Sequence, residues 1–389
     1  MSSVAACAHV YRAYSVIDDL EEEHDPLVTL YAIQSTKSLG GTVTSSADSD
    51  WQTLPTRVQQ ALSAGWNNSG MPAVASALYS RWWQLETWLR SLVYVELRSA
   101  KGSTWADMLP LTSADRQQRD EDFRHMRTPD VQDQLAYLDA GRLLQLTVDQ
   151  WSLFRLYLPT QKIWEGRIEE LKAIRNRISH CRKPHPDDLD RVEQTLRDLD
   201  GGAFLATSSF NDQWEPKDEW SDLLVRDWIH GEHSAAHLIE HGRRQYDTTF
   251  ALSLSRRPWA EPLTKTESQV GCRPGHVWHA QWVFRGGRAF NLSKFWRDIE
   301  FKKGPITLVC AHSPSSLDVS FSSLEDQRQV SDIIGTSFDA ALTNLGRNYC
   351  EEDHAEWARR HSNIDARVHA ATPWATVDPV MEGISIFAA

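Results

Sequence analysis

The sequence predicts a multidomain protein in which an all-α helical bundle is followed by an α+β domain. Between residues 71 and 200, apolar side chains recur every three or four positions, as they do on the buried faces of helices. After residue 201, short runs rich in β-branched and aromatic residues alternate with helical patterns. With 389 residues, the chain is also long enough to bury more than one hydrophobic core.

The N-terminal region, residues 1–70, has the weakest pattern. Residues 10–20 and 27–33 are candidates for short elements, and the stretch 35–50, rich in Ser, Gly and Thr, predicts a flexible loop. The first twenty residues lack the basic head and the long apolar run of a secretory signal. We expect no targeting segment here.

Residues 71–200 are expected to form the helical bundle. The strongest helix covers 74–97, where six apolar side chains fall three or four positions apart and predict one buried stripe: Leu78, Trp82, Leu85, Leu89, Leu92 and Val93. Glu86 and Arg90 lie one helical turn apart beside that stripe. Further helices are predicted at 116–127, 129–145, 148–157, 158–181 and 186–199. Gly201 and Gly202 then predict a boundary.

Residues 201–389 are expected to form the α+β domain, with a recognition or regulatory role. Helical patterns cover 219–244, 326–345 and 354–369. Strands are predicted at 277–284, 306–311 and 317–321, because these runs are rich in β-branched and aromatic residues and are bounded by Gly, Pro or Ser.

Composition narrows the functional classes. The formal net charge of −12 argues against a protein that coats nucleic acid by bulk electrostatics, although one focused basic cleft remains compatible with it. Five scattered cysteines without a CxxC pair favour a reducing compartment, and the sequence has no long apolar run, so we expect a cytoplasmic protein without a membrane partner. Seventeen tryptophans indicate either large packing contacts or base-stacking surfaces.

The segment 171–183 stands out against this acidic background. It holds five basic residues and no acid: Lys172, Arg175, Arg177, Arg182 and Lys183. Arginine can grip phosphate oxygens with two parallel hydrogen bonds, and histidine exchanges a proton near neutral pH. Arg175, Asn176 and His180 therefore form a candidate site for phosphate chemistry.

On a helix, Asn176 and His180 share a face, but Arg175 and His180 diverge by about 140° at 3.6 residues per turn. The prolines at 184 and 186 stop the helix close by. Three arrangements solve the geometry: the long Arg175 side chain reaches round, the helix loosens at its end, or a second copy faces the first across a two-fold axis.

The string Arg-Asn-x-x-x-His at 175–180 closes the helical bundle, and Glu86-x-x-x-Arg90 follows Trp82, Trp83 and Leu85 on an earlier helix. This combination resembles the HEPN superfamily over about residues 72–200, a third of the chain. The resemblance implies an all-α bundle whose Arg-x(4–6)-His motif marks metal-independent endoribonucleases. Many of these are bacterial toxins or abortive-infection and anti-phage effectors, and they typically act as dimers with the motif at the interface.

Carried over by position, the resemblance implies that Arg175, His180 and Asn176 are catalytic and that Glu86 and Arg90 support them. Lys172, Arg177, Arg182 and Lys183 are expected to bind nucleic acid. The implied reaction leaves a 2′,3′-cyclic phosphate and needs no metal or other cofactor. The expected partners are RNA, a second copy of the chain, and an antitoxin or trigger protein.

Several alternatives stay open on the sequence. Arg175 and His180 also suit a helix C-terminus, where cations are favoured, and Glu86 with Arg90 also suits a surface pair. The bundle is alternatively a non-catalytic nucleotide-binding or assembly module. A metal-dependent hydrolase is the third hypothesis, centred on a helical stripe of four histidines with a nearby cluster: His230, His233, His237 and His241, then Cys272, His276 and His279. Arginines near 256–288, interleaved with aromatic residues, indicate either a nucleic-acid platform or ordinary strand packing.

Overall fold

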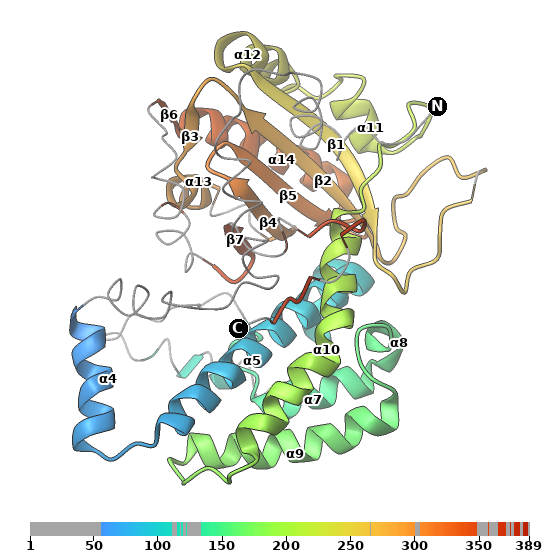
Figure 1. Ribbon diagram of the computed structural model, residues 1–389. Coiled ribbons are helices and arrows are strands. Elements are labelled where there is room, and N and C mark those ends of the chain that lie inside the picture. Colours follow the sequence, from blue (N-terminus) through green and yellow to red (C-terminus); the bar gives the residue numbers. More distant parts are fainter. Residues whose placement is uncertain are drawn as a thin grey trace.

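The computed structural model describes residues 56–110, 134–264, 266–299 and 304–347, with the short stretches 115–116, 118–119, 122, 357, 365–370, 374, 377–381 and 384–387. A group of helices in the lower half of Figure 1 adjoins a sheet region in the upper half, and α10 (Asp188–Asn211) reaches from one into the other. The predicted order, a helical bundle followed by an α+β domain, is confirmed.

The helical part contains α4 (Thr56–Asn68), α5 (Ala73–Lys101), the short 3-10 helix η1 (Gly102–Met108), α7 (Ala140–Asp149), α8 (Trp151–Phe154), α9 (Gln161–Ser179) and α10. The stripe predicted on α5 is buried: Leu78, Leu85 and Leu92 have no exposed surface. The same core takes in Trp164 and Ile168 of α9. The sequence predicts no element over α4.

Several predicted elements fall outside the described residues. These are the elements at 10–20 and 27–33, the loop at 35–50 and most of the helix at 116–127. The segment 129–145 is described from residue 134, and its helix, α7, begins only at Ala140. Asp139 fixes that start, because its side chain accepts a hydrogen bond of 2.9 Å from the backbone N–H of Arg142.

The predicted end of α10 is wrong. The helix continues through Gly201 and Gly202 to Asn211 instead of stopping at residue 199. A Cβ atom added to Gly202 would lie 1.9 Å from the carbonyl oxygen of Tyr157, in the turn that follows α8. Gly202 therefore marks a close approach of two backbone segments inside the helix.

The upper part is built on a five-stranded sheet of order β1-β2-β5-β4-β7. Its strands are β1 (Thr248–Arg256), β2 (His276–Phe284), β4 (Ile306–Ser313), β5 (Ser316–Ser322) and β7 (Val368–Ala370). Neighbours are antiparallel, except that β4 and β7 run parallel. A two-stranded sheet pairs β3 (Arg288–Phe290) with β6 (Leu345–Arg347). The strands β2, β4 and β5 confirm the three that the sequence predicts, whereas β7 corrects the end of the helix predicted at 354–369.

The single helix predicted over 219–244 is also wrong. Two short helices, α11 (Leu223–Trp228) and α12 (His237–Tyr246), take its place. Gly231 lies between them with a φ of +76°, a left-handed conformation that a continuous right-handed helix excludes. Two further helices pack on the sheet, α13 (Leu292–Asp298) and α14 (Gln327–Thr343), and α14 confirms the helix predicted over 326–345.

The two faces of the sheet differ in chemistry. One face is apolar, and its Leu254, Trp282 and Phe321 share a core with Ile334 and Phe338 of α14. The opposite face carries mainly polar side chains and meets the helical part, as Figure 1 shows for α10. Phe210 of α10 packs edge-on against the His279 imidazole there, with ring centroids 4.8 Å apart.

A buried ion pair ties α5 to the sheet region. Glu96 of α5 and Arg257, just after β1, are both fully buried, and their nearest charged atoms lie 2.6 Å apart. The indole N–H of Trp259 donates a 2.6 Å hydrogen bond to the same carboxylate. Arg257 therefore belongs to the contact between the two parts of the molecule and cannot serve the nucleic-acid platform that its sequence context allows.

None of the helices in the described part of the chain combines the length and the apolar character needed to cross a bilayer.

Candidate functional site: the end of helix α9

Helix α9 ends just before the predicted motif does. Its last residue is Ser179, and Cys181 then takes a left-handed φ of +51°. The N–H of Cys181 bonds to the carbonyl of Ile178 at 3.1 Å, and the N–H of Arg182 bonds to that of Arg177 at 2.9 Å. These two hydrogen bonds together form a Schellman motif, which satisfies the last helical carbonyls without a glycine. Pro184 follows the stop and is not its direct cause.

His180 is the cap residue of this helix end. Its φ of −100° and ψ of 18° leave helical geometry, and its side chain is exposed. Arg175, one turn earlier, lies in regular helix and is half-buried. The helix thus loosens only at His180 itself. In the part of the chain that the structure describes, no hydrogen bond or ion pair joins the side chains of Arg175 and His180, or engages either of them elsewhere.

Arg175 and Asn176 line a pocket of about 350 Å³ together with Trp82, Arg116, Asp139, Ala140, Gly141, Leu144 and Lys172. Three of these side chains are cationic and one is acidic. Asp139 is 3.4 Å from Arg116, and Lys172 forms an exposed 3.0 Å pair with Glu169. The first residues of α7 also lie in the wall, where a helix N-terminus adds partial positive charge. The pocket suits an anionic group. Of its three cationic side chains, Arg175 is the one without an ion-pair partner among the described residues.

Glu86 and Arg90 are brought together, as the sequence predicts for them. Glu86 accepts a 2.6 Å hydrogen bond from the indole N–H of Trp82 and forms an ion pair with Arg90. Arg90 donates a second bond, of 3.0 Å, to the carbonyl oxygen of Leu138, just before α7. Glu86 therefore fixes the pocket's tryptophan and, through Arg90, the start of α7. In the described part of the chain, Glu86 forms no hydrogen bond or ion pair with Arg175.

Arg177 has a structural role, because its side chain binds Asp188. Its Nε atom donates a 2.8 Å hydrogen bond to the Asp188 carboxylate at the start of α10, and its Nη2 atom donates a second. The backbone N–H of His185 adds a third bond, of 2.9 Å. Burial disfavours the charged carboxylate, but these hydrogen bonds outweigh it and lower the pKa of Asp188, while the pKa of Arg177 is raised. The loop that carries His180 is thereby fastened at both ends.

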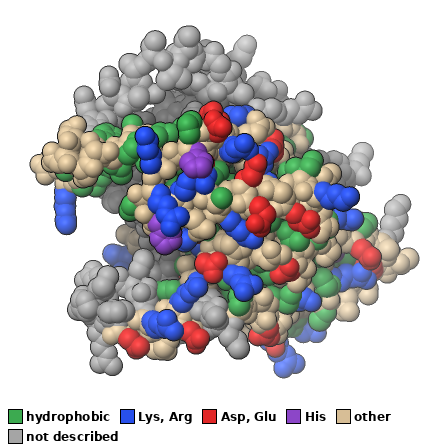
Figure 2. Space-filling model, turned by 90° about the horizontal axis from the view of Figure 1, so that it is seen from below, with side chains coloured by type: hydrophobic (Ala, Val, Ile, Leu, Met, Phe, Trp, Pro, Cys, Tyr) green, Lys and Arg blue, Asp and Glu red, His purple; other side chains and the backbone are tan. Residues whose placement is uncertain are grey.

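Arg182 and Lys183 are exposed on the loop after α9. Seen from below, Lys and Arg side chains gather around histidine on this face of the molecule (Figure 2). Of the predicted nucleic-acid-binding residues, Lys172 thus lines the pocket, Arg182 and Lys183 extend onto the surface, and Arg177 is held by Asp188.

Sequence reasoning missed three contributors: Asp188, Arg116 and the N-terminus of α7. Asp188 had a usable signal, since an acid in the first turn of one helix can pair with a base in the last turn of the previous one. Arg116 lies far from the motif along the chain and only the tertiary fold brings it to the pocket.

The distal histidines do not form the predicted stripe. His230 and His233 lie between α11 and α12, whereas His237 and His241 lie on α12. His233 instead stacks on Trp228 and contacts Asp332 at 3.2 Å. Within the described ranges, no three His, Cys, Asp or Glu side chains converge as metal ligands would.

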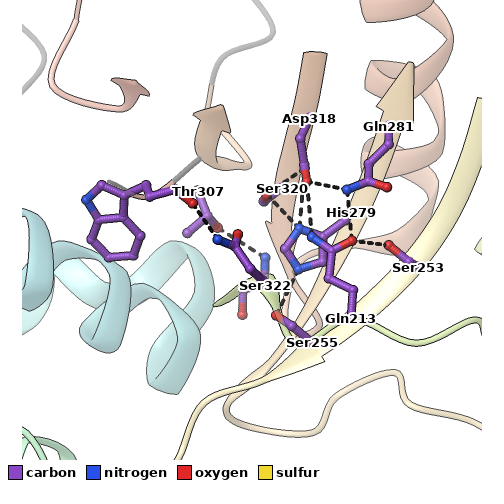
Figure 3. Close-up of polar contacts among 11 residues, drawn as sticks. Gln213, Ser253, Ser255, His279, Gln281, Thr307, Asp318, Ser320 and Ser322 are labelled. Atoms are coloured by element: carbon purple, nitrogen blue, oxygen red, sulfur yellow. Dashed lines mark hydrogen bonds and ion pairs between the residues drawn. The ribbon is translucent and has the colours of Figure 1, made fainter. Parts of the chain in front are cut away.

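A second cluster of polar side chains lies on the face of the sheet that meets the helical part (Figure 3). The His279 imidazole is 2.8 Å from the Ser255 hydroxyl and 3.3 Å from the Asp318 carboxylate. Burial opposes ionisation of Asp318, but His279 and a hydrogen bond from Gln281 outweigh it and lower its pKa. These residue types match a hydrolytic triad. All three are buried, Ser255 and His279 completely, so a substrate cannot reach the hydroxyl. The cluster satisfies polar groups between the sheet and α10.

Comparison with known proteins identifies the helical part. Residues 83–200 match a family model described as Swt1-like HEPN. The match runs from Trp83 in α5 to Asp200 in α10 and includes Arg175, Asn176 and His180. No curated protein and no solved structure matches the chain.

Proposed function

We propose that the protein is a metal-independent endoribonuclease. The HEPN domain that residues 83–200 form supports a ribonuclease-type function in general. The observation that carries the proposal is the end of α9. Arg175 and Asn176 line a cationic pocket, and His180 stands exposed at the cap of the same helix. Within the described residues, none of the three side chains is used to hold the fold.

The proposed reaction is an internal transfer at one phosphate. His180 takes the proton of a ribose 2′-hydroxyl, and the 2′-oxygen attacks the adjacent phosphorus. The bond from phosphorus to the 5′-oxygen breaks, and that oxygen receives a proton from the partner subunit's His180 or from water. Arg175 stabilises the charge that grows on the non-bridging oxygens, and Asn176 orients the phosphate. The products are a 2′,3′-cyclic phosphate and a 5′-hydroxyl.

A homodimer supports this chemistry best. Because Arg175 lies inside the helix and His180 caps it, the two side chains of one chain do not bond to each other in the described part of the structure. Two copies that meet at the ends of α9 place two imidazoles and two guanidinium groups around one strand of RNA. The basic loop residues Arg182 and Lys183 then extend the contact along the backbone. We further propose that the protein acts in the cytoplasm as a toxin or anti-phage effector, restrained by an antitoxin or released by a trigger.

The test uses the purified full chain with bulk RNA in EDTA. We expect cleavage that falls at least about a hundredfold in His180→Ala and in Arg175→Ala, the usual scale for losing an acid-base group or a charge stabiliser. His185→Ala is the matched control, since His185 is the exposed histidine of the same loop and its hydrogen bonds with Asp188 use backbone atoms of His185, which the change to alanine keeps. An oligonucleotide with 2′-deoxyribose at the cleaved position should stay intact.

Three other results decide against the proposal. EDTA-sensitive cleavage that survives both changes would indicate a metal-dependent hydrolase. A dimer that binds nucleotides without cutting RNA would indicate a non-catalytic module. Equal loss of activity in His185→Ala and His180→Ala would place the effect in the loop's structure instead of in the imidazole of His180.

A further inference from the structure

Two aromatic side chains stand on the surface of α5, the helix that contributes Trp82 to the pocket. Tyr79 is 53% exposed and Trp83 is 61% exposed, the largest exposed fractions among the aromatic residues of the described part. They lie one helical turn apart, and their ring centroids are 6.4 Å apart with planes tilted by 39°. We call these two rings the aromatic shelf.

The shelf is held on a rigid support. The neighbouring side chains Leu78 and Trp82 are buried in the helical core, so α5 cannot rotate to hide the two rings. Trp82 is held further by its hydrogen bond to Glu86. Burying such large apolar rings is normally favourable, and leaving two of them exposed on a fixed helix indicates that a ligand covers them.

Two hydroxyl side chains flank the shelf on α5. Ser80 and Thr87 are exposed, and their hydroxyls bond back to the backbone, to Ser76 O at 3.0 Å and to Trp83 O at 2.7 Å. Neither the Tyr79 hydroxyl nor the Trp83 indole N–H bonds to a residue that the structure describes. Two rings flanked by hydroxyl groups suit flat ligands with polar edges.

The shelf is linked to the cationic pocket by Trp82, which lies between Tyr79 and Trp83 in the chain and lines the pocket with Lys172, Arg175 and Asn176. Positive charge beside exposed rings is the combination that binds single-stranded nucleic acid, because cations follow the phosphates while bases stack on the rings. A duplex offers its phosphates but keeps its bases stacked inside.

We propose that the aromatic shelf stacks unpaired bases of the RNA whose phosphate occupies the neighbouring pocket, so that the enzyme selects single-stranded RNA. This inference rests on the proposed function and names its substrate class. The shelf contributes through base stacking, whereas Lys172 and Arg175 contribute through charge, and the two contributions respond differently to salt.

The test measures binding in the full chain carrying His180→Ala, so that it does not depend on cleavage. The probe is a fluorescent single-stranded RNA, compared with a duplex and with an abasic strand of equal length. Adding Trp83→Ala should weaken binding of the single strand about tenfold, the scale of one stacked base, and leave the salt dependence unchanged. Trp83→Phe should restore most of it. Ile163→Ala, which removes an exposed apolar side chain near the opposite end of α9, should change nothing.

The abasic strand should bind equally weakly to the parent and to Trp83→Ala, since it has no base to stack. The inference is overturned if Trp83→Ala binds the single strand as the parent does, if no single strand binds at all, or if duplex binds as tightly. It is also overturned if Trp83→Ala converts a dimer to monomers whose affinity per chain is unchanged, since the face then joins two copies. If Trp83→Ala weakens binding of the single strand but the wild type does not cleave RNA, only the proposed nuclease activity is rejected. If the wild type cleaves RNA and Trp83→Ala cleaves it equally well, only the role of the aromatic shelf is rejected.

Discussion

The guanidinium of Arg177 donates two hydrogen bonds to the carboxylate of Asp188, and this pair joins the last turn of α9 to the first turn of α10. Asp188 is almost fully buried, and it also accepts the backbone N–H of His185. One carboxylate thus fixes the loop on which His180, Arg182 and Lys183 are displayed.

Asp188→Asn should lower the free energy of unfolding by about 2–3 kcal/mol at pH 7, because it removes charge-assisted hydrogen bonds to a buried group. The pKa of Asp188 is lowered in the folded state, so its contribution is complete above its unfolded pKa and is lost as pH falls through the folded value. Urea unfolding at pH 7 and near pH 3 should therefore show a difference from wild type that shrinks with acid. Asp190→Asn, an exposed acid in the same helical turn, is the control and should cost under about 1 kcal/mol.

Gly202→Ala should be strongly destabilising, whereas Gly201→Ala should be slightly stabilising. A Cβ at 202 would meet the Tyr157 backbone at 1.9 Å, but one at 201 meets nothing within 4 Å. Alanine is favoured over glycine inside a helix by about 1 kcal/mol, so the two neighbouring changes should have opposite signs. Thermal unfolding of both variants tests this. Similar melting temperatures would mean that α10 and the turn after α8 lie further apart than described.

Glu96→Ala should cost about 3–5 kcal/mol, because it leaves the fully buried Arg257 without its partner. Replacing both residues by apolar ones, as in Glu96→Leu with Arg257→Met, should recover most of that loss. Glu240→Ala, which breaks exposed pairs with Arg243 and Arg244, is the matched control and should change stability far less than Glu96→Ala. Denaturant titration distinguishes these outcomes, and equal effects at positions 96 and 240 would contradict the buried pair.

His369 should make the protein less stable in mild acid. Burial lowers its pKa to about 4, and a backbone hydrogen bond at Ala366 and the charge of Asp365 only partly oppose this. Between its ordinary pKa near 6.5 and that value, the unfolded chain binds a proton that the folded chain does not. The free energy of unfolding should therefore fall, by up to about 3 kcal/mol, as pH drops from 6.5 to 4. His369→Gln should flatten this dependence, and His241→Gln, an exposed control, should not.

The sequence by itself determined the order of a helical bundle and an α+β domain, the buried stripe of α5, three central strands and the basic end of α9. These features depend on local periodicity and on charge along one segment, which the order of residues records directly. It failed where distant contacts outweigh local preference. Gly202 looks like a turn signal, but it lies inside α10, where the backbone of Tyr157 comes too close for any larger residue.

The predicted stripe of histidines does not form because of a local feature. Gly231 adopts a left-handed conformation that interrupts an otherwise helical pattern. β1 was missed although its serines alternate with apolar residues, which is the pattern of a strand with two unlike faces. The packing of α10 against the sheet buries those serines. The tertiary structure alone decided that Arg177 holds Asp188 while Arg175 lines the pocket. Both are arginines of one helix, and what distinguishes them is which other helix lies opposite each side chain.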